Sequence, residues 1–321
     1  MKLRVCSDLE EGEQLWRALW NHEHLFDLWE VRMCFQRAFG RPMHFVVAET
    51  RLRPVGMLAL SLIPETQCFG CFPGETWQGR TWLEQNRIPA ENPSVREALW
   101  EAAPENSEIR YLHPDFAAAL SDATIDEEGF LFKPRVHGFD IKSYWGLFSH
   151  KSRRLLRREI ERFESMGSRF VLDHEGDIPW MFEINLAKLK ERSYFRDPRF
   201  LEGFEAMLSF LARNRMLRVT TIRIKGKRAA VDVGAVFHNR YVVLAGATDP
   251  EFLGIAKMIN LFHIEWGCSQ QFEEIDFLCG DFGWKRRFHL LPRPLYMVER
   301  SSAPAFLPMP QIGQETAFAE V

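Results

Sequence analysis

Two carboxylates and a lysine lie close together in a short stretch near the end of the chain. Asp276 belongs to an apolar run that predicts a strand, Asp281 follows the turn at Gly280, and Lys285 comes four residues later. Side chains alternate between the faces of a strand, so Asp276 points away from its immediate apolar neighbours. A carboxylate on a buried strand needs a partner, and it can also accept a proton from a reacting group. We therefore take Asp276 as a candidate general base.

Asp281 and Lys285 are one helical turn apart, which is the spacing of an ion pair on a helix. Asp281 can also cap the turn that follows Gly280. One interpretation is a capped turn between a strand and a helix with a solvated ion pair, because charges at element ends are usually structural. In the functional interpretation, Asp281 holds Lys285, and Lys285 presents a cation to an anionic acceptor or a phosphate.

A basic segment at 151–158 is the second candidate for binding chemistry. In a helix it forms two stripes, Arg153 with Arg157 and Arg154 with Arg158. Acidic residues follow at 159, 161 and 164, which favours a solvated helix face. The alternative is that Arg154 and Arg158 contact a phosphorylated or polyanionic acceptor.

The bulk composition is that of a folded protein with 321 residues, of which 46% are hydrophobic. The formal net charge of -3 supplies no global basic field, so we expect no DNA partner and do not expect tRNA. The longest apolar run, 55–63, is too short to span a bilayer, and residues 1–10 lack the apolar core of a signal peptide. We expect a cytoplasmic protein without a membrane partner.

The six cysteines do not indicate a metal site. Only Cys68 and Cys71 are closely spaced, and Cys268 with Cys279 lacks the spacing of a second pair. We expect structural cysteines and no bound metal. The sequence also lacks a nucleophile-elbow serine and a zinc-protease signature.

The order of predicted elements is the same in the two halves of the chain. In the second half, a strand at 169–174 and helices at 179–192 and 199–214 precede an antiparallel meander at 217–225, 229–237 and 241–247. A helix at 253–267, a strand at 274–278, a helix from 282 and a strand at 295–299 follow. The first half gives a strand at 3–6, helices at 11–20 and 27–39, and a meander at 44–50, 55–63 and 67–72. Its later elements are expected at 94–101, 108–112, 114–120 and 130–133.

This order predicts an α+β fold with a central, mostly antiparallel mixed sheet flanked by helices. We expect a first domain at 1–134 and a second at 135–300, which includes a basic connecting helix at 149–166. The tail at 301–321 is rich in proline and small residues, which is typical of a loose terminus.

The element order resembles that of GNAT acyltransferases, and the motifs resemble the CelD/BcsL-like branch, which is related to the Fem-type aminoacyl transferases. The branch has a basic segment between its halves, matched by 151–158, and a loop matched by Leu253-Gly254-Ile255-Ala256-Lys257. Its ending is matched by Asp276-Phe277, Gly280-Asp281 and Lys285. Trp284 stands where the branch has tyrosine, and only Gly254 remains of the fuller pyrophosphate signature. The likeness covers roughly 43–298.

The resemblance implies tandem GNAT-like domains and transfer of an acyl group from acetyl-CoA or another acyl-CoA to an amine. The helix that starts after Gly254 would hold a pyrophosphate with its backbone N–H groups. The strand end Ala245-Gly246-Ala247 leaves backbone groups open to a pantetheine arm, although small residues there could serve packing alone. The site is expected in the second domain, with Asp276 as base, Asp281 with Lys285 as an acceptor-holding pair, and Trp284 beside the acceptor.

The resemblance implies as acceptor an amine of a small molecule, an amino sugar or an envelope or polysaccharide precursor. A Fem-type transferase that uses aminoacyl-tRNA is the first alternative. A catalytically silent binding protein is the second, because the pyrophosphate signature is incomplete. The first domain is expected to be without activity, since it has no counterpart of Asp276, Asp281 and Lys285.

Overall fold

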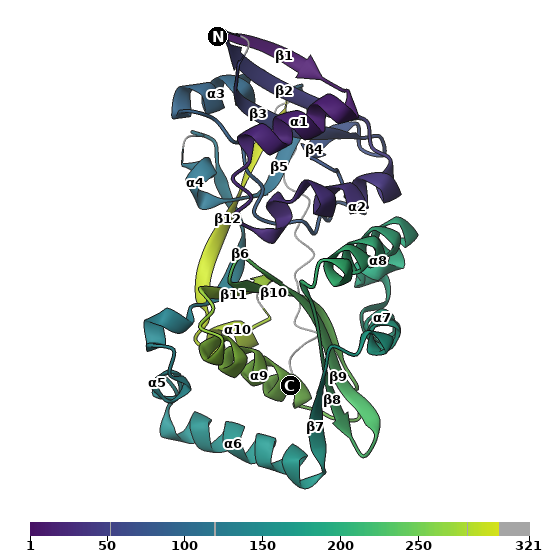
Figure 1. Ribbon diagram of the computed structural model, residues 1–321, viewed down its shortest axis with the longest axis vertical. Helices are drawn as coiled ribbons and strands as arrows, with labels where there is room; N and C mark the ends of the chain where they lie inside the picture. Colours follow the sequence, from purple (N-terminus) through teal and green to yellow (C-terminus); the bar gives the residue numbers. More distant parts are fainter. Residues whose placement is uncertain (52, 119, 281, 302–321) are drawn as a thin grey trace. The chain divides into compact units, whose positions relative to one another are not determined.

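Apolar runs with a period of two and helical stripes place strands and helices in two compact units with an α+β fold (Figure 1). The computed structural model describes residues 1–51, 53–118, 120–280 and 282–301. The strands are mostly antiparallel and are flanked by helices, as expected from the sequence. The tail expected at 301–321 lies outside the described residues, apart from Ser301.

The first unit is built from Met1–Glu128, Asp197–Phe210 and the part of the chain that begins at Pro294. Its strand order is β1-β2-β3-β4-β5-β12. The strands are β1 (Lys2–Cys6), β2 (Met43–Thr50), β3 (Arg53–Ile63), β4 (Cys68–Cys71), β5 (Ser107–Leu112) and β12 (Leu291–Arg300). The helices are α1 (Leu9–Leu19), α2 (Trp29–Phe39), α3 (Pro93–Glu101), α4 (Pro114–Ala117) and most of α8 (Pro198–Arg213).

The second unit is built from Gly129–Arg196 and Leu211–Arg293 within the described residues. Its strand order is β6-β11-β10-β9-β8-β7. The strands are the second part of β6 (Thr124–Phe132), β7 (Ser168–Leu172), β8 (Leu217–Ile224), β9 (Lys227–Phe237), β10 (Arg240–Thr248) and β11 (Glu274–Cys279). The helices are α5 (Ile141–Trp145), α6 (His150–Ser165), α7 (Ile178–Leu189), α9 (Ile255–Ser269) and α10 (Trp284–Arg287).

The repeated element order of the two halves appears as a repeated pairing pattern. Strands β1 to β4 form an antiparallel series, and β4 then pairs with β5 in parallel through Phe69 and Ser107. Strands β7 to β10 form the same series, and β10 pairs with β11 in parallel. The two predicted meanders are therefore present.

The last strand of each half pairs within the other unit. Strand β6 of the first half pairs antiparallel with β11, and β12 of the second half pairs antiparallel with β5. Helix α8 also belongs to the second half of the sequence but packs in the first unit. Its Phe200 ring packs on Phe35, and its Phe204 ring packs on Trp82. Each unit therefore contains segments from both halves of the sequence. Independent domains at 1–134 and 135–300 stay a prediction.

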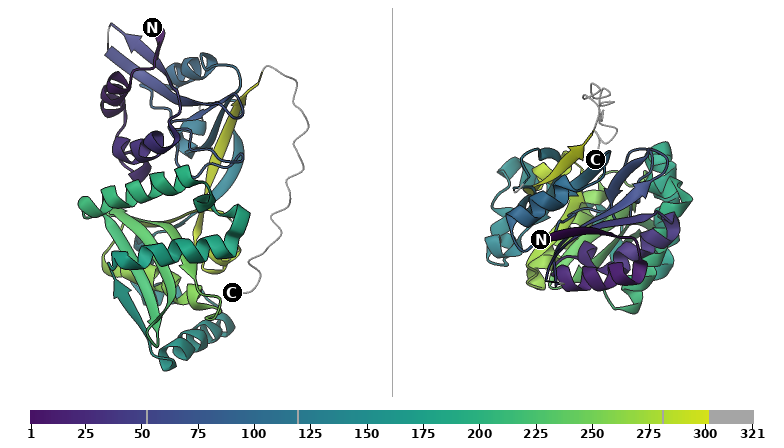
Figure 2. Two further views of the ribbon diagram at one scale, coloured as in Figure 1. Left: turned by 90° about the vertical axis from the view of Figure 1, so that its right-hand side faces the viewer. Right: turned by 90° about the horizontal axis from the view of Figure 1, so that it is seen from above.

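Two apolar clusters cover one face of the sheet in the second unit. Helix α9 contributes Ile255 and Ile259 to a cluster with Ile222 and Ala230, and Ile264 to a second cluster with Ile275. Helix α7 packs against β9 and β10, and Figure 2 (left) shows it in front of those strands. Within the described residues, every helix is too short or too polar to cross a membrane.

Candidate functional site

Strands β10 and β11 pair only at their beginnings and then separate. Their parallel ladder joins Arg240 to Glu274, Tyr241 to Ile275 and Val242 to Asp276, and it ends there within the described residues. Strand β10 continues along β9 as far as Thr248. Beyond Val242, the described residues of β11 therefore no longer pair with this edge of β10. An extended ligand could pair with the edge as an added strand. We call this region the β10–β11 split.

Strand β10 carries a bulge at the split, followed by small residues. Its register against β9 shifts between Val243 and Ala245, which bends the strand and turns its edge. Gly246 after the bulge is exposed, and a Cβ built on it would lie 2.0 Å from Oδ1 of Asp232. The predicted donor-binding strand residues Ala245, Gly246 and Ala247 all lie on this part of β10, and the side chain of Ala247 is buried.

Helix α9 begins beyond the end of β10 with a glycine in the left-handed conformation. Gly254 is the N-cap residue and has φ +89. The N–H groups of Ile255 and Lys257 donate to the carbonyls of Phe252 and Gly254, whereas those of Gly254 and Ala256 have no backbone acceptor within the described residues. These two N–H groups and the positive end of the helix dipole suit an anion. The predicted loop residues fit the phosphates of an acyl-CoA in this respect.

The basic helix α6 is tied to this loop by its second half. Nη2 of Arg162 donates to the carbonyl of Leu253 at 2.6 Å, and Nζ of Lys257 lies 2.8 Å from Oε2 of Glu159. A Cβ on Gly254 would lie 3.7 Å from Nη2 of Arg162. Arg162 and Lys257 thus place two cations beside the start of α9.

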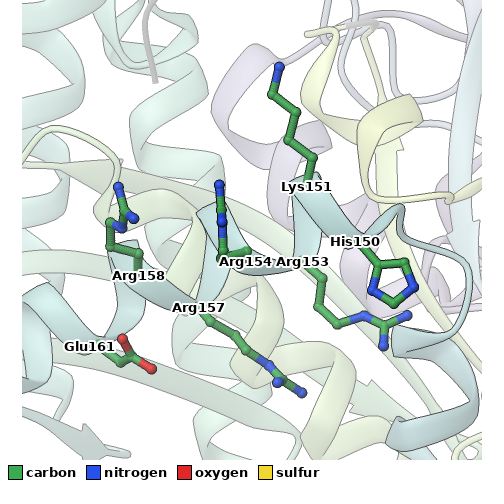
Figure 3. A pocket seen from close by; sticks show the side chains of 7 residues that line it. All are labelled: His150, Lys151, Arg153, Arg154, Arg157, Arg158 and Glu161. Carbon is green, nitrogen blue, oxygen red and sulfur yellow. The ribbon is translucent and has the colours of Figure 1, made fainter.

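The cations in the first half of α6 project from two sides of the helix. Figure 3 shows Lys151, Arg154 and Arg158 pointing to one side, and Arg153 and Arg157 to the other. Arg154 and Arg158 are exposed, as is most of this face. Together with His150 and Glu161 these side chains line an open hollow, and every lining residue within the described chain comes from α6. A hollow walled by one helix is a charged surface rather than a preformed pocket.

Asp276 is buried on β11, and both of its carboxylate oxygens have partners. Oδ2 lies 3.0 Å from Nη1 of Arg293 on β12, and Oδ1 accepts the N–H of Leu278 at 2.8 Å. Glu274 is buried on the same face of the strand, and its burial, followed by the charge of Asp276, raises the pKa of Glu274. This ion pair lies at the point where β11 leaves β10, because Asp276 pairs with Val242 at the end of the ladder. Its role as a base stays a prediction.

Lys285 is buried and holds the end of β11. Its Nζ donates to the carbonyls of Phe277, Leu278 and Cys279 at 2.9, 2.9 and 2.8 Å. Leu278 has φ +57, at a point where the register of β11 against β6 shifts. Asp276 and Lys285 therefore both bind this irregular end of β11. These contacts give Lys285 a structural task, and its acceptor-holding role stays a prediction.

The helix expected from residue 282 begins two residues later, at Trp284, because Gly283 with φ +64 is its N-cap residue. Asp281 lies outside the described residues, so its predicted cap and ion pair do too. Trp284 is half-buried, with its ring packed edge-on against Phe277 and Phe288 at 5.5 Å. Its acceptor-binding role stays a prediction.

A buried aspartate–histidine pair beside the split was missed by the sequence reasoning. Oδ2 of Asp232 on β9 lies 3.0 Å from Nε2 of His263 on α9, and both side chains are buried. Burial, followed by the charge of Asp232, raises the pKa of Tyr241 well above its usual range. The available signal was an aspartate inside the apolar run 229–237.

Lys188 is a second residue that the sequence reasoning missed. It lies on α7, and its Nζ is 3.5 Å from Oγ1 of Thr248 at the end of β10. Burial lowers the pKa of its ammonium group. Periodicity alone places this lysine on a helix, without indicating the strand end that it contacts.

Comparison with known proteins gives a family match for the segment that contains this arrangement. Residues 150–286 match the family model described as the acetyltransferase (GNAT) domain. This segment, less than half of the chain, is similar in sequence to that domain. It contains the β10–β11 split, the glycine-led start of α9 and Asp276. No curated protein matches the chain significantly.

Solved structures with the same fold extend along nearly the whole chain. A conserved protein of unknown function from Bacteroides thetaiotaomicron has a TM-score of 0.58 at 15% identity, and the match covers 92% of this chain and 99% of that one. FemX has a TM-score of 0.56 at 9% identity, covering 92% and 97%. L-PGS from Bacillus licheniformis has a TM-score of 0.55 at 11% identity, covering 92% of each. At these identities the likeness shows the fold alone.

Proposed function

We propose that the chain is an acyl-CoA-dependent N-acyltransferase of the CelD/BcsL-like branch, with acetyl-CoA as the first candidate donor. The observation that carries the proposal is the β10–β11 split, which lies directly before a glycine-led helix start in the segment that matches the GNAT domain. One end of this arrangement suits phosphates, and the other offers an open strand edge. The acceptor is proposed to be an amine of a small molecule, an amino sugar or an envelope or polysaccharide precursor.

The donor would be held along the line from α9 to the split. The N–H groups of Gly254 and Ala256, with the cations of Arg162 and Lys257, would hold its phosphates. The arm would then run back along β10, past Gly246, and pair with the strand edge in the manner of an added strand. A backbone N–H at the bulge would face the thioester oxygen as charge develops on it.

The acceptor amine must lose a proton before it can attack. An unperturbed alkylamine has a pKa of about 10.4 and is mostly protonated at pH 7. We propose Asp276 as the group that takes this proton. The amine nitrogen then forms a bond to the acyl carbon, the carbon–sulfur bond breaks, and the sulfur leaves with the electron pair and recovers a proton. An acyl-CoA supplies the activated thioester for this exchange.

Thermal unfolding with acetyl-CoA tests the donor. At about 100 times its dissociation constant, a ligand that binds only the folded state adds about 2.7 kcal/mol to the free energy of unfolding. We expect this stabilisation with acetyl-CoA, and acetyl-CoA-dependent release of free thiol when an amine acceptor is added. If neither acetyl-CoA nor longer acyl-CoA compounds stabilise the protein, the proposed donor is wrong.

The basic face of α6 favours one alternative, a Fem-type transferase that uses aminoacyl-tRNA. Lys151, Arg154 and Arg158 form an exposed cationic row that would suit a nucleic-acid backbone. This reading predicts tRNA binding that weakens steeply as the salt concentration rises, without stabilisation by acyl-CoA. A catalytically silent binding protein is the remaining alternative, and it predicts neither response.

A further inference from the structure

One side of the split carries a carboxylate oxygen without a protein partner. Oδ1 of Asp232 accepts no hydrogen bond from any residue within the described ranges, while Oδ2 is bound by His263. The Asp232 side chain is 9% exposed, so nine-tenths of its surface is buried. An acceptor oxygen that has no protein donor, on a side chain that is mostly buried, marks a place where a donor group can bind.

The direction of Oδ1 is set by Gly246, which is paired with Asp232 across β9 and β10. A Cβ at position 246 would lie 2.0 Å from Oδ1 and 2.9 Å from Cγ of Asp232, so any side chain there would displace the carboxylate. Gly246 is exposed. The missing side chain therefore leaves an opening through which Oδ1 can be reached from outside.

His263 fixes the orientation of the carboxylate. The ring is fully buried on α9, and its Nε2 lies 3.0 Å from Oδ2. Nδ1 is buried and has no hydrogen-bond partner within the described residues. The contact of the ring with the carboxylate therefore runs through Nε2, whose N–H can donate to Oδ2. This contact occupies Oδ2 and leaves Oδ1 as the oxygen that can accept a hydrogen bond from a ligand.

Asp232 lies on the path that the donor arm would follow. It belongs to the face of β9 that α9 covers, because it contacts His263 and its same-face neighbour Ala230 packs with Ile255 and Ile259. Gly246 lies between the bulge at Val243 and the loop that leads to α9. An arm that joins phosphates at α9 to a thioester at the split must pass this glycine.

We propose that Asp232, oriented by His263, accepts a hydrogen bond from an amide N–H of the pantetheine arm, through the opening left by Gly246. The inference rests on the proposed function, since it requires an acyl-CoA donor. It names a contact to the arm that is made by a side chain, in addition to the strand edge. A ligand without the arm gains nothing from this contact.

Two ligands separate this role from a general effect on the fold. Coenzyme A contains the arm, whereas adenosine 3′,5′-bisphosphate contains nucleotide phosphates without it. We expect Asp232→Ala to weaken coenzyme A binding by about tenfold, because a hydrogen bond to a charged group is lost. The affinity for adenosine 3′,5′-bisphosphate should stay unchanged, as should both affinities in the control Asp173→Ala, whose aspartate follows β7.

Gly246→Ala provides a second variant that keeps the carboxylate. Its new Cβ should close the opening and reduce coenzyme A affinity, with the bisphosphate affinity again unchanged. Equal losses for both ligands, or unchanged coenzyme A affinity in both variants, would overturn the inference while leaving the donor intact. Failure of the wild-type protein to bind coenzyme A would instead overturn the proposed function, and the inference with it.

Discussion

At the scale of single residues, Asp276 combines an ion pair with a proposed proton transfer. Its Oδ2 lies 3.0 Å from Nη1 of Arg293. We expect Asp276→Asn to lower turnover by about 10²- to 10⁴-fold, because a general base is lost, while the fold is retained. Steady-state turnover and circular dichroism check the two parts.

Arg293→Met is the matched control for Asp276→Asn. It breaks the same ion pair but keeps the carboxylate. The proposed base role predicts a much smaller loss of turnover in Arg293→Met than in Asp276→Asn. Equal losses would mean that Asp276 acts by holding β11, and unchanged turnover in Asp276→Asn would exclude it as the base.

Lys285 belongs to the same scale, and its contacts predict a loss of stability. Its ammonium group donates hydrogen bonds to three carbonyls at the end of β11. We expect Lys285→Met to lower the free energy of unfolding by about 1–3 kcal/mol, because buried acceptors lose their donor while the aliphatic stem remains. Urea unfolding measures the change. The acceptor-holding role predicts weaker acceptor binding as well, and a variant with normal acceptor affinity would argue against that role.

At the scale of elements, the start of α9 depends on a glycine with a positive φ. Alanine at position 254, where φ is +89, costs about 1 kcal/mol and should disturb the N–H groups proposed for the donor phosphates. We expect Gly254→Ala to weaken coenzyme A binding. Gly226→Ala is the control, because Gly226 has φ +84 in the turn between β8 and β9 and is strained to a similar degree. If both variants bind coenzyme A equally well, the start of α9 does not hold the donor.

The docking of α8 in the first unit predicts a dependence on pH. Glu65 lies within ion-pair distance of Arg41 and of Arg199 near the start of α8. The hydrogen bond from Arg41, followed by that from Arg199, lowers the pKa of Glu65 from 4.5 to about 2. A lowered carboxylate pKa stabilises the folded state above about pH 4.5, and this contribution is lost as the pH falls toward 2.

Thermal unfolding of Glu65→Gln and the wild-type protein at several pH values checks this dependence. The wild-type protein should have the higher unfolding midpoint at pH 7, by a small margin because Glu65 is half exposed. The difference should shrink between pH 4.5 and pH 2. A difference that stays constant with pH would contradict the link to Glu65.

At the scale of the whole molecule, the sequence predicts the elements better than their partners. Alternating apolar residues locate both meanders, and the stripe of Ile255 and Ile259 locates α9. The exchange of β6 and β12 between the halves was not predictable, because an apolar alternation predicts a strand without indicating which strand it pairs with. Tertiary contacts also decide which residues of the candidate site meet.

In the candidate site, too, the sequence predicts the elements that carry residues but not which residues meet. Asp276 and Gly254 could be found from strand and helix signals, whereas Asp232 and His263 are 31 residues apart and meet only when α9 packs on β9. Helical spacing assigned Lys285 to Asp281. Its contacts with three carbonyls depend on the positive φ of Leu278, and a leucine in the sequence does not predict a positive φ.

The proposed function requires the second unit to bind an acyl-CoA along β10 and the start of α9. Hydrogen–deuterium exchange of the full chain, with and without coenzyme A, tests it most directly, because bound amides become protected. We expect slower exchange at 243–247 and 254–257 with coenzyme A, and no change in β2 to β4. Unchanged exchange at those sites under saturating coenzyme A, or protection confined to β2 to β4, would contradict it.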